Sequence, residues 1–144
     1  MSAHAAVVVH RRVAWNETDA AGHNHFSAVF RWIEESEHEL YRQLGFEPTM
    51  IDRIPRVHIE ADYRQRLYFG QWIAVEVAVG SVGRASCEFS FTVRTEDDQV
   101  AAEGRYVIVH VSSTSSGSTP WPEDVRTALT ADHRFAVRSG LVDE

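Results

Sequence analysis

The sequence has little cysteine, little positive charge and no long hydrophobic run, and each shortage excludes a class of protein. Cys87 is the single cysteine among 144 residues, so no disulfide can form within the chain. Fourteen Lys and Arg stand against 21 Asp and Glu, and the net charge of −7 opposes general binding to nucleic acid or to an anionic membrane surface. No stretch is long enough to span a bilayer, and the first residues lack the apolar run of a signal peptide. We therefore expect a cytoplasmic protein without nucleic-acid or membrane partners.

The composition that is present is typical of one globular domain. Hydrophobic residues make up 44% of the chain and charged residues 24%, and no internal repeat occurs. The one break in composition is "SSTSSGSTPWP", which predicts a surface loop. The following "EDVRTALTADHRFAV" predicts a short amphipathic helix. We expect residues 1–144 to form a single domain.

The middle of the chain alternates between apolar and polar residues, which is the pattern of half-buried strands. In "WIAVEVAVGS" every second residue from Ile73 to Val79 is apolar and branched. "ASCEFSFTVRTEDDQVAAEGRYVIVHV" repeats the alternation on both sides of a polar turn and predicts a long antiparallel hairpin. Within it Cys87 alternates with Phe89, which indicates core packing for the thiol. "AVVVHRRVAW" and "RVHIEADYRQRLYFG" are further predicted strands.

One segment has the period of a long helix. Apolar residues recur at helical spacing from Phe26 to Leu44, glutamates fill other positions, and Gly45 ends the pattern. A helix of about 19 residues extends roughly 28 Å. Together with a long antiparallel meander it predicts an α+β fold in which an antiparallel sheet wraps around one long central helix.

The stretch "WNETDAAGHNHFSAVF" before this helix holds the most chemically suggestive residues. His23 and His25 invite a metal site, but an i, i+2 pair suits a strand or loop, and no third ligand follows at a recognised spacing. We therefore expect no metal and no cofactor. Asp19 is open to two interpretations. A helix N-cap is the simpler one from the residues alone, and a catalytic carboxylate is the other.

The order of elements and the residues at the helix entrance resemble the hotdog-fold acyl-CoA thioesterases, in particular the 4-hydroxybenzoyl-CoA thioesterase group. The resemblance covers nearly the whole chain. "VHIEADYRQRLYFGQWIAVEVAVGSVGRASCEFSFTV" is similar to the second half of these proteins, and "STPWPEDVRTAL" is similar to their exit segment. Their entrance pattern is an aromatic strand end, an acidic residue, Thr-Asp, two small residues and Gly, matched here by Trp15, Glu17, Thr18, Asp19, Ala20, Ala21 and Gly22.

The resemblance implies a catalytic site at the start of the helix. It places the base or nucleophile at Asp19 and the backbone N–H that polarises the thioester carbonyl at Phe26, with Gly22 allowing a close turn between them. Some relatives carry a tyrosine four residues before the aspartate and a histidine seven after it. Trp15 and Phe26 stand there in this chain, and neither side chain is an acid or base. His25, one position early, is a candidate for the pocket only.

Three arginines are candidates for binding the phosphates of CoA, because an acidic protein needs local positive charge to hold them. Arg64 and Arg66 alternate on one face of "DYRQRLYF". Arg84 stands just before Ser86, where relatives place nucleotide contacts. Ordinary surface charge is an equal alternative for each arginine singly.

The function implied is hydrolysis of an acyl-CoA thioester, by a general-base or an anhydride route that the sequence does not separate. A thioesterase that acts on an acyl carrier protein and a non-catalytic acyl-binding protein of the same fold are the alternatives. A dehydratase of this fold ranks third, because "AGHNHF" lacks the proline-rich surroundings usual in such relatives. A sheet with one helix leaves a face and an edge uncovered, so we expect a homodimer that pairs further into a dimer of dimers, with the active site at the dimer interface.

Overall fold

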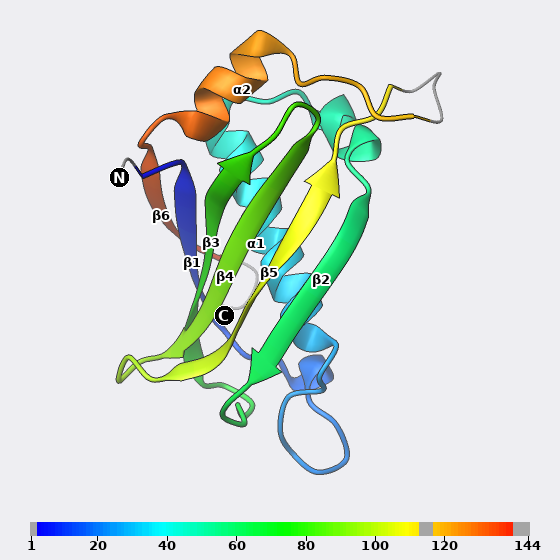
Figure 1. The fold of residues 1–144 in the computed structure, drawn as a ribbon. Helices are drawn as coiled ribbons and strands as arrows, with labels where there is room; N and C mark the ends of the chain where they lie inside the picture. Colours follow the sequence, from blue (N-terminus) through cyan, green and yellow to red (C-terminus); the bar gives the residue numbers. More distant parts are fainter. Residues whose placement is uncertain (1–2, 113–116, 140–144) are drawn as a thin grey trace.

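The computed structural model describes residues 3–112 and 117–139, in which six strands form one sheet around a long helix (Figure 1). The predicted α+β class is confirmed. The elements are β1 (Ala6–Arg12), α1 (Ala28–Leu44), β2 (Arg56–Tyr63), β3 (Trp72–Val82), β4 (Ser86–Thr95), β5 (Val100–Val109), α2 (Glu123–Thr130) and β6 (Arg134–Arg138). Short 3₁₀ helices cover Trp15–Glu17 and Pro48–Arg53.

The strands lie in the order β2-β5-β4-β3-β1-β6. All neighbours are antiparallel except β1 and β6, which are parallel. The predicted antiparallel sheet thus has one parallel pair at its edge, and the expectation of a helix through "EDVRTALTADHRFAV" is corrected. Helix α2 ends at Thr130, Ala131 adopts an extended backbone, and the alternation of Phe135 and Val137 then suits a strand on the free edge of β1.

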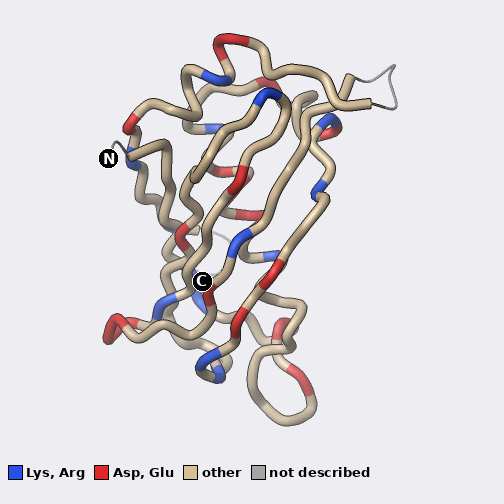
Figure 2. Tube along the Cα trace, in the orientation of Figure 1, with Lys and Arg blue, Asp and Glu red and all other residues tan. Residues whose placement is uncertain are grey.

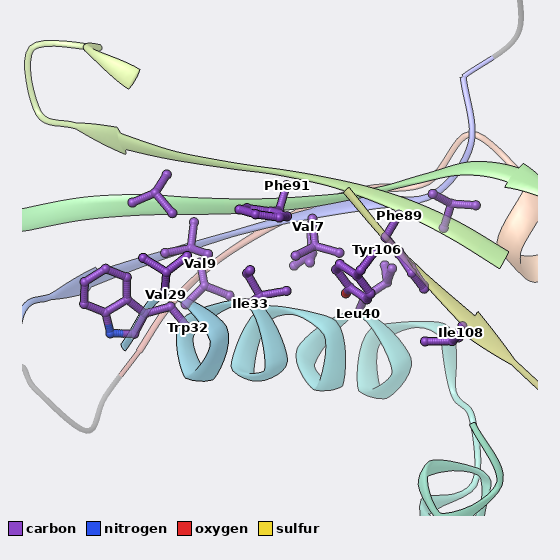
Figure 3. Close-up of a cluster of buried hydrophobic side chains, with 14 of the residues drawn as sticks. Val7, Val9, Val29, Trp32, Ile33, Leu40, Phe89, Phe91, Tyr106 and Ile108 are labelled. Carbon is purple, nitrogen blue, oxygen red and sulfur yellow. The ribbon is translucent and has the colours of Figure 1, made fainter. Parts of the chain in front are cut away.

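The core lies between α1 and the concave face of the sheet. Figure 3 shows Trp32, Ile33 and Leu40 of the helix directed at strand residues that include Phe89 and Phe91. The alternating face of β3 is buried as predicted, and so is the Cys87 thiol. Burial, together with the charges of Glu37 and Glu88, raises the pKa of that thiol far above its usual value, which fits a packing role.

Helix α1 begins two residues later than predicted and ends where predicted. Its N-cap is Ser27, and Gly45 closes it with a positive φ of 80°. The segment from residue 18 to residue 27 is therefore a loop outside the helix. In the part of the chain that is described, no helix combines the length and the apolar character needed to cross a membrane.

Candidate active site

Asp19 lies in a tight turn of this loop. Its Oδ1 accepts a hydrogen bond of 2.9 Å from the Ala21 N–H, and its carbonyl accepts one of 2.9 Å from the Gly22 N–H. Gly22 has a φ of 90°, which favours glycine at this position. The Asp19 side chain is 31% exposed. The turn thus presents a carboxylate with open access to solvent.

The structure excludes the capping interpretation of Asp19 for α1. The N-cap of that helix is Ser27, and the Asp19 oxygen bonds to the backbone two residues ahead of it in the turn. The alternative that remains for Asp19, apart from catalysis, is turn closure.

Glu17 anchors the start of the loop to the body of the protein. Both of its carboxylate oxygens accept hydrogen bonds from one Arg11 nitrogen, at 2.8 and 2.7 Å, and the Ala14 N–H donates to it at 2.8 Å. Arg11 is 6% exposed and also binds Glu35 on α1 at 2.9 Å. The Glu17 carbonyl accepts the His25 N–H at 2.8 Å. This nearly buried pair therefore joins both ends of the loop to β1 and α1.

Asn24 joins the loop to the connection between β2 and β3. Its N–H donates to the Leu67 carbonyl at 2.7 Å, and its Oδ1 accepts the Leu67 N–H at 3.0 Å. Asn24 is 8% exposed, so both bonds are shielded from water. Two segments about forty residues apart in sequence thereby become the two sides of one site.

Between these segments is an open pocket of about 450 Å³. It brings together four of the residues predicted for the site, Asp19, Phe26, Arg64 and Arg66. The complete lining is Asp19, His23, Asn24, Phe26, Tyr63, Arg64, Gln65 and Arg66.

Within the described part of the chain, the Phe26 N–H is an unpaired donor. From Asn24 to Ala28 the other backbone N–H groups all donate, that of Ser27 to the His25 ring and the rest to carbonyl oxygens. The Phe26 N–H has no acceptor among residues 3–112 and 117–139. A free main-chain donor at the rim of a pocket that holds a carboxylate is the arrangement that acyl transfer requires.

The two pocket arginines differ in their partners. The Arg64 Nε is 2.6 Å from Glu103, and an Arg64 Nη lies 3.9 Å from Asp62. Arg66 makes no ion pair with any described residue. Figure 2 shows acidic and basic residues mixed along the sheet. Arg66 is therefore the more available cation for an anionic ligand at this pocket.

The structure separates the other predicted site residues from the pocket lining. Gly22 shapes the turn, and the His25 ring packs on Phe26 at 4.6 Å, with its Nδ1 2.8 Å from the Ser27 hydroxyl. Arg84 and Ser86 lie by the other end of β3, close to α2, far from the loop (Figure 1). Their carbonyls accept the backbone N–H and the ring N–H of Trp121, at 3.0 and 2.9 Å. Within one chain they do not border this pocket.

Sequence reasoning missed three lining residues, His23, Asn24 and Gln65, and considered Tyr63 only as aromatic area that could line an acyl pocket, with core packing as the alternative. The His23 Nδ1 lies 4.0 Å from the Asp19 carboxylate, and the four-residue spacing across Gly22 is a signal for that approach. Tyr63 donates a hydrogen bond of 2.7 Å to the Phe26 carbonyl across 37 residues, for which no local pattern exists. Among the described residues, no three His, Cys, Asp or Glu side chains are grouped as metal ligands would be.

Comparison with known proteins identifies a family to which this chain is similar. Residues 13–129 match the family described as "Thioesterase-like superfamily". A 1,4-dihydroxy-2-naphthoyl-CoA hydrolase of Prochlorococcus marinus (strain NATL1A) is 34% identical over 116 residues, which cover 72% of this chain and 75% of that protein. The range matched by the family, residues 13–129, includes every residue that lines the pocket.

Solved structures share the fold. A 1,4-dihydroxy-2-naphthoyl-CoA thioesterase from Synechocystis, Slr0204, superposes with a TM-score of 0.80 at 18% identity and covers 86% of this chain and 95% of its own. A 4-hydroxybenzoyl-CoA thioesterase variant complexed with 4-hydroxybenzoyl-CoA gives 0.77 at 14% identity, with 87% and 99% covered. The predicted hotdog fold is confirmed.

Proposed function

We propose, from the premise that this chain belongs to the thioesterase-like superfamily, that the pocket at Asp19 and Phe26 hydrolyses an acyl-CoA thioester to the free acid and CoA. One observation carries the proposal. Asp19 lines the same open pocket as Phe26, whose N–H has no acceptor among the described residues. A thioester needs both functions, a base or nucleophile and a donor for the oxyanion.

In this mechanism the thioester carbonyl oxygen lies against the Phe26 N–H, which stabilises the negative charge that develops there. Asp19 either takes a proton from water as the water attacks the carbonyl carbon, or attacks that carbon itself to form an anhydride. In the second route water then attacks the substrate-derived carbonyl carbon of the anhydride, which releases the Asp19 carboxylate. In both routes the C–S bond breaks, the CoA sulfur leaves as a thiolate that acquires a proton, and water supplies the second carboxyl oxygen of the acid. Nothing in this sequence of bonds requires a metal or cofactor.

The acyl group that we propose is aromatic. Two of the similar proteins are named for 1,4-dihydroxy-2-naphthoyl-CoA and one for 4-hydroxybenzoyl-CoA, all aromatic acyl groups. The pocket rim offers Phe26 and Tyr63, which are 62% and 45% exposed. Exposed rings at a pocket provide area against which an aromatic acyl group packs. Arg66, without an ion-pair partner among the described residues, is the proposed contact for a CoA phosphate.

We also propose a homodimer, paired further into a dimer of dimers. Strand β2 is at an edge of the sheet and is exposed along its length except at the half-buried Ala61. Val57 and Ile59 on it are 60% and 40% exposed. An uncovered edge with apolar side chains is suited to pairing with a second copy. Arg84 and Ser86 would contact substrate only if another copy brings them to the pocket.

A thiol-release assay with aromatic acyl-CoA, aliphatic acyl-CoA and acyl carrier-protein substrates tests the proposal. The expected result is turnover of aromatic acyl-CoA at a higher kcat/KM than the other two. Preference for the carrier protein would favour release of a biosynthetic acyl group. Binding of acyl-CoA without thiol release would identify an acyl-binding protein and contradict the proposed catalysis.

A further inference from the structure

We infer that Tyr63 is a positioning residue for the oxyanion hole, which holds the Phe26 main chain in place through a hydrogen bond from its hydroxyl to the Phe26 carbonyl. The inference rests on the proposed function. The bond is 2.7 Å long and joins the end of β2 to the loop before α1. Tyr63 also lines the pocket that contains Asp19.

Among the residues that the structure describes, no backbone N–H donates to the Phe26 carbonyl. The Phe30 N–H, the nearest candidate in the first helical turn, donates to the Ser27 carbonyl at 3.1 Å. Within the described residues, the Tyr63 hydroxyl is thus the hydrogen-bond partner of the Phe26 main chain. The other polar group of the same peptide, the Ser27 N–H, donates to the His25 ring nitrogen at 3.2 Å, so the Tyr63 bond is the second restraint on this peptide and the one on its carbonyl side.

Two bonds fix the two peptides on either side of Phe26. The His25 carbonyl accepts the Ala28 N–H at 2.9 Å, and this holds the peptide whose other polar group is the Phe26 N–H. Because a trans peptide directs its N–H opposite to its C=O, that bond turns the Phe26 N–H away from the helix. The Tyr63 hydroxyl holds the next peptide. A main-chain donor restrained on both sides is preorganised for charge stabilisation.

The tyrosine itself is well anchored. Tyr63 pairs with Ala102 of β5, and the N–H groups of Arg64 and Gln65 both donate to the Ala101 carbonyl, at 2.7 and 3.1 Å. Partial burial raises the pKa of the Tyr63 hydroxyl above its usual value, so the group keeps its proton through the neutral range. The hydroxyl is therefore a donor held by a rigid strand end.

The test replaces Tyr63 by phenylalanine, which deletes the hydroxyl and keeps the ring. We expect kcat for an aromatic acyl-CoA to fall on the order of tenfold, the ratio that corresponds to one lost hydrogen bond. KM should stay within about twofold, because orientation of the oxyanion donor acts mainly in the transition state. The matched control is Tyr68→Phe, at a ring that is 51% exposed and whose hydroxyl has no partner among the described residues. Circular dichroism should be unchanged in both variants, and the melting temperature should stay the same for Tyr68→Phe and fall by no more than about 3 °C for Tyr63→Phe, which loses one hydrogen bond.

A second measurement reports on the donor directly. In the Asp19→Asn background, the thioester C=O stretch of bound acyl-CoA should shift to lower frequency than in solution, and Tyr63→Phe should reduce that shift while Tyr68→Phe does not. An undiminished kcat, or an undiminished shift, in the Tyr63→Phe protein would overturn the inference. A changed pH profile would also overturn it, because it would mean that Tyr63 exchanges protons with the substrate. Absence of turnover and of the shift in the protein with Tyr63 intact would instead reject the proposed function, and the inference with it.

Discussion

Replacement of Asp19 by asparagine separates catalysis from turn formation. Asparagine keeps the side-chain oxygen that accepts the Ala21 N–H and removes the negative charge. The carboxylate has one further close charged or titratable neighbour among the described residues, the His23 Nδ1 at 4.0 Å, and the Asp19 side chain is 31% exposed. The folding cost of the substitution is therefore limited to the difference between a charged and a neutral acceptor.

That difference is about 1 kcal/mol as an upper figure, which lowers the melting temperature by about 3 °C in a chain of this size. Loss of a general base or nucleophile has a larger effect. It lowers kcat by on the order of a hundredfold or more, equivalent to about 2.7 kcal/mol of transition-state stabilisation. The two effects are far enough apart to be measured independently.

Thiol release from an aromatic acyl-CoA gives kcat, and thermal unfolding followed by circular dichroism gives stability. We expect Asp19→Asn and Asp19→Ala to lose kcat to a similar extent, whereas the alanine variant alone loses the turn hydrogen bond and unfolds at a clearly lower temperature. If Asp19 only closed the turn, the asparagine variant would keep a near-normal kcat, and only the alanine variant would lose activity together with the turn hydrogen bond. Near-normal kcat in the asparagine variant would refute the assignment of Asp19 to catalysis.

Three further predictions concern the surroundings of the site. Arg66→Ala should raise KM for acyl-CoA several-fold with little change in kcat, and it should not change the kinetics of an acyl-pantetheine thioester. Arg64→Ala should have a smaller effect, because the Arg64 side chain is already paired with Glu103. Equal losses on both substrates would exclude phosphate binding by these arginines. Arg11→Met should lower the free energy of unfolding, measured in urea, by about 3 kcal/mol, because the Glu17 carboxylate then lacks its charged partner in a nearly buried site. Ile59→Lys on the β2 edge should convert a dimer to monomers in sedimentation, and a wild-type monomer that is active at micromolar concentration would argue against the dimer.

The fold was largely predictable because its main signals are local. The alternation from Ile73 to Val79 and the helical period up to Gly45 each require only neighbouring residues, and the structure has β3 and α1 at those places. Strand β6 was missed because its five residues depend on pairing with β1, more than 120 residues earlier. Five residues carry too short a pattern to distinguish a strand from the end of a helix.

The candidate site was predictable in part. Asp19 and Phe26 lie seven residues apart in one continuous segment, and the resemblance to the thioesterases implied that the two act together. Tyr63 comes from another element, and its distance from Phe26 depends on where β2 ends. The position of Arg84 away from the pocket was not predictable for a similar reason, since it depends on the length and direction of a strand. The eleven residues of β3 separate its two ends by about 35 Å, a length that the alternation reveals without showing which end faces the loop.

The oxyanion donor that we propose at residue 26 belongs to the main chain, and this separates the evolution of specificity from the evolution of chemistry. Eighteen of the nineteen possible substitutions at this position keep an N–H, and proline alone deletes it. The Phe26 side chain is 62% exposed and contributes little to the core, so its replacement has a low folding cost. A gene library that varies this codon would therefore sample new acyl preferences while most members retain the backbone N–H proposed as oxyanion donor. In an enzyme whose oxyanion donor is a side chain, the same variation would remove the donor.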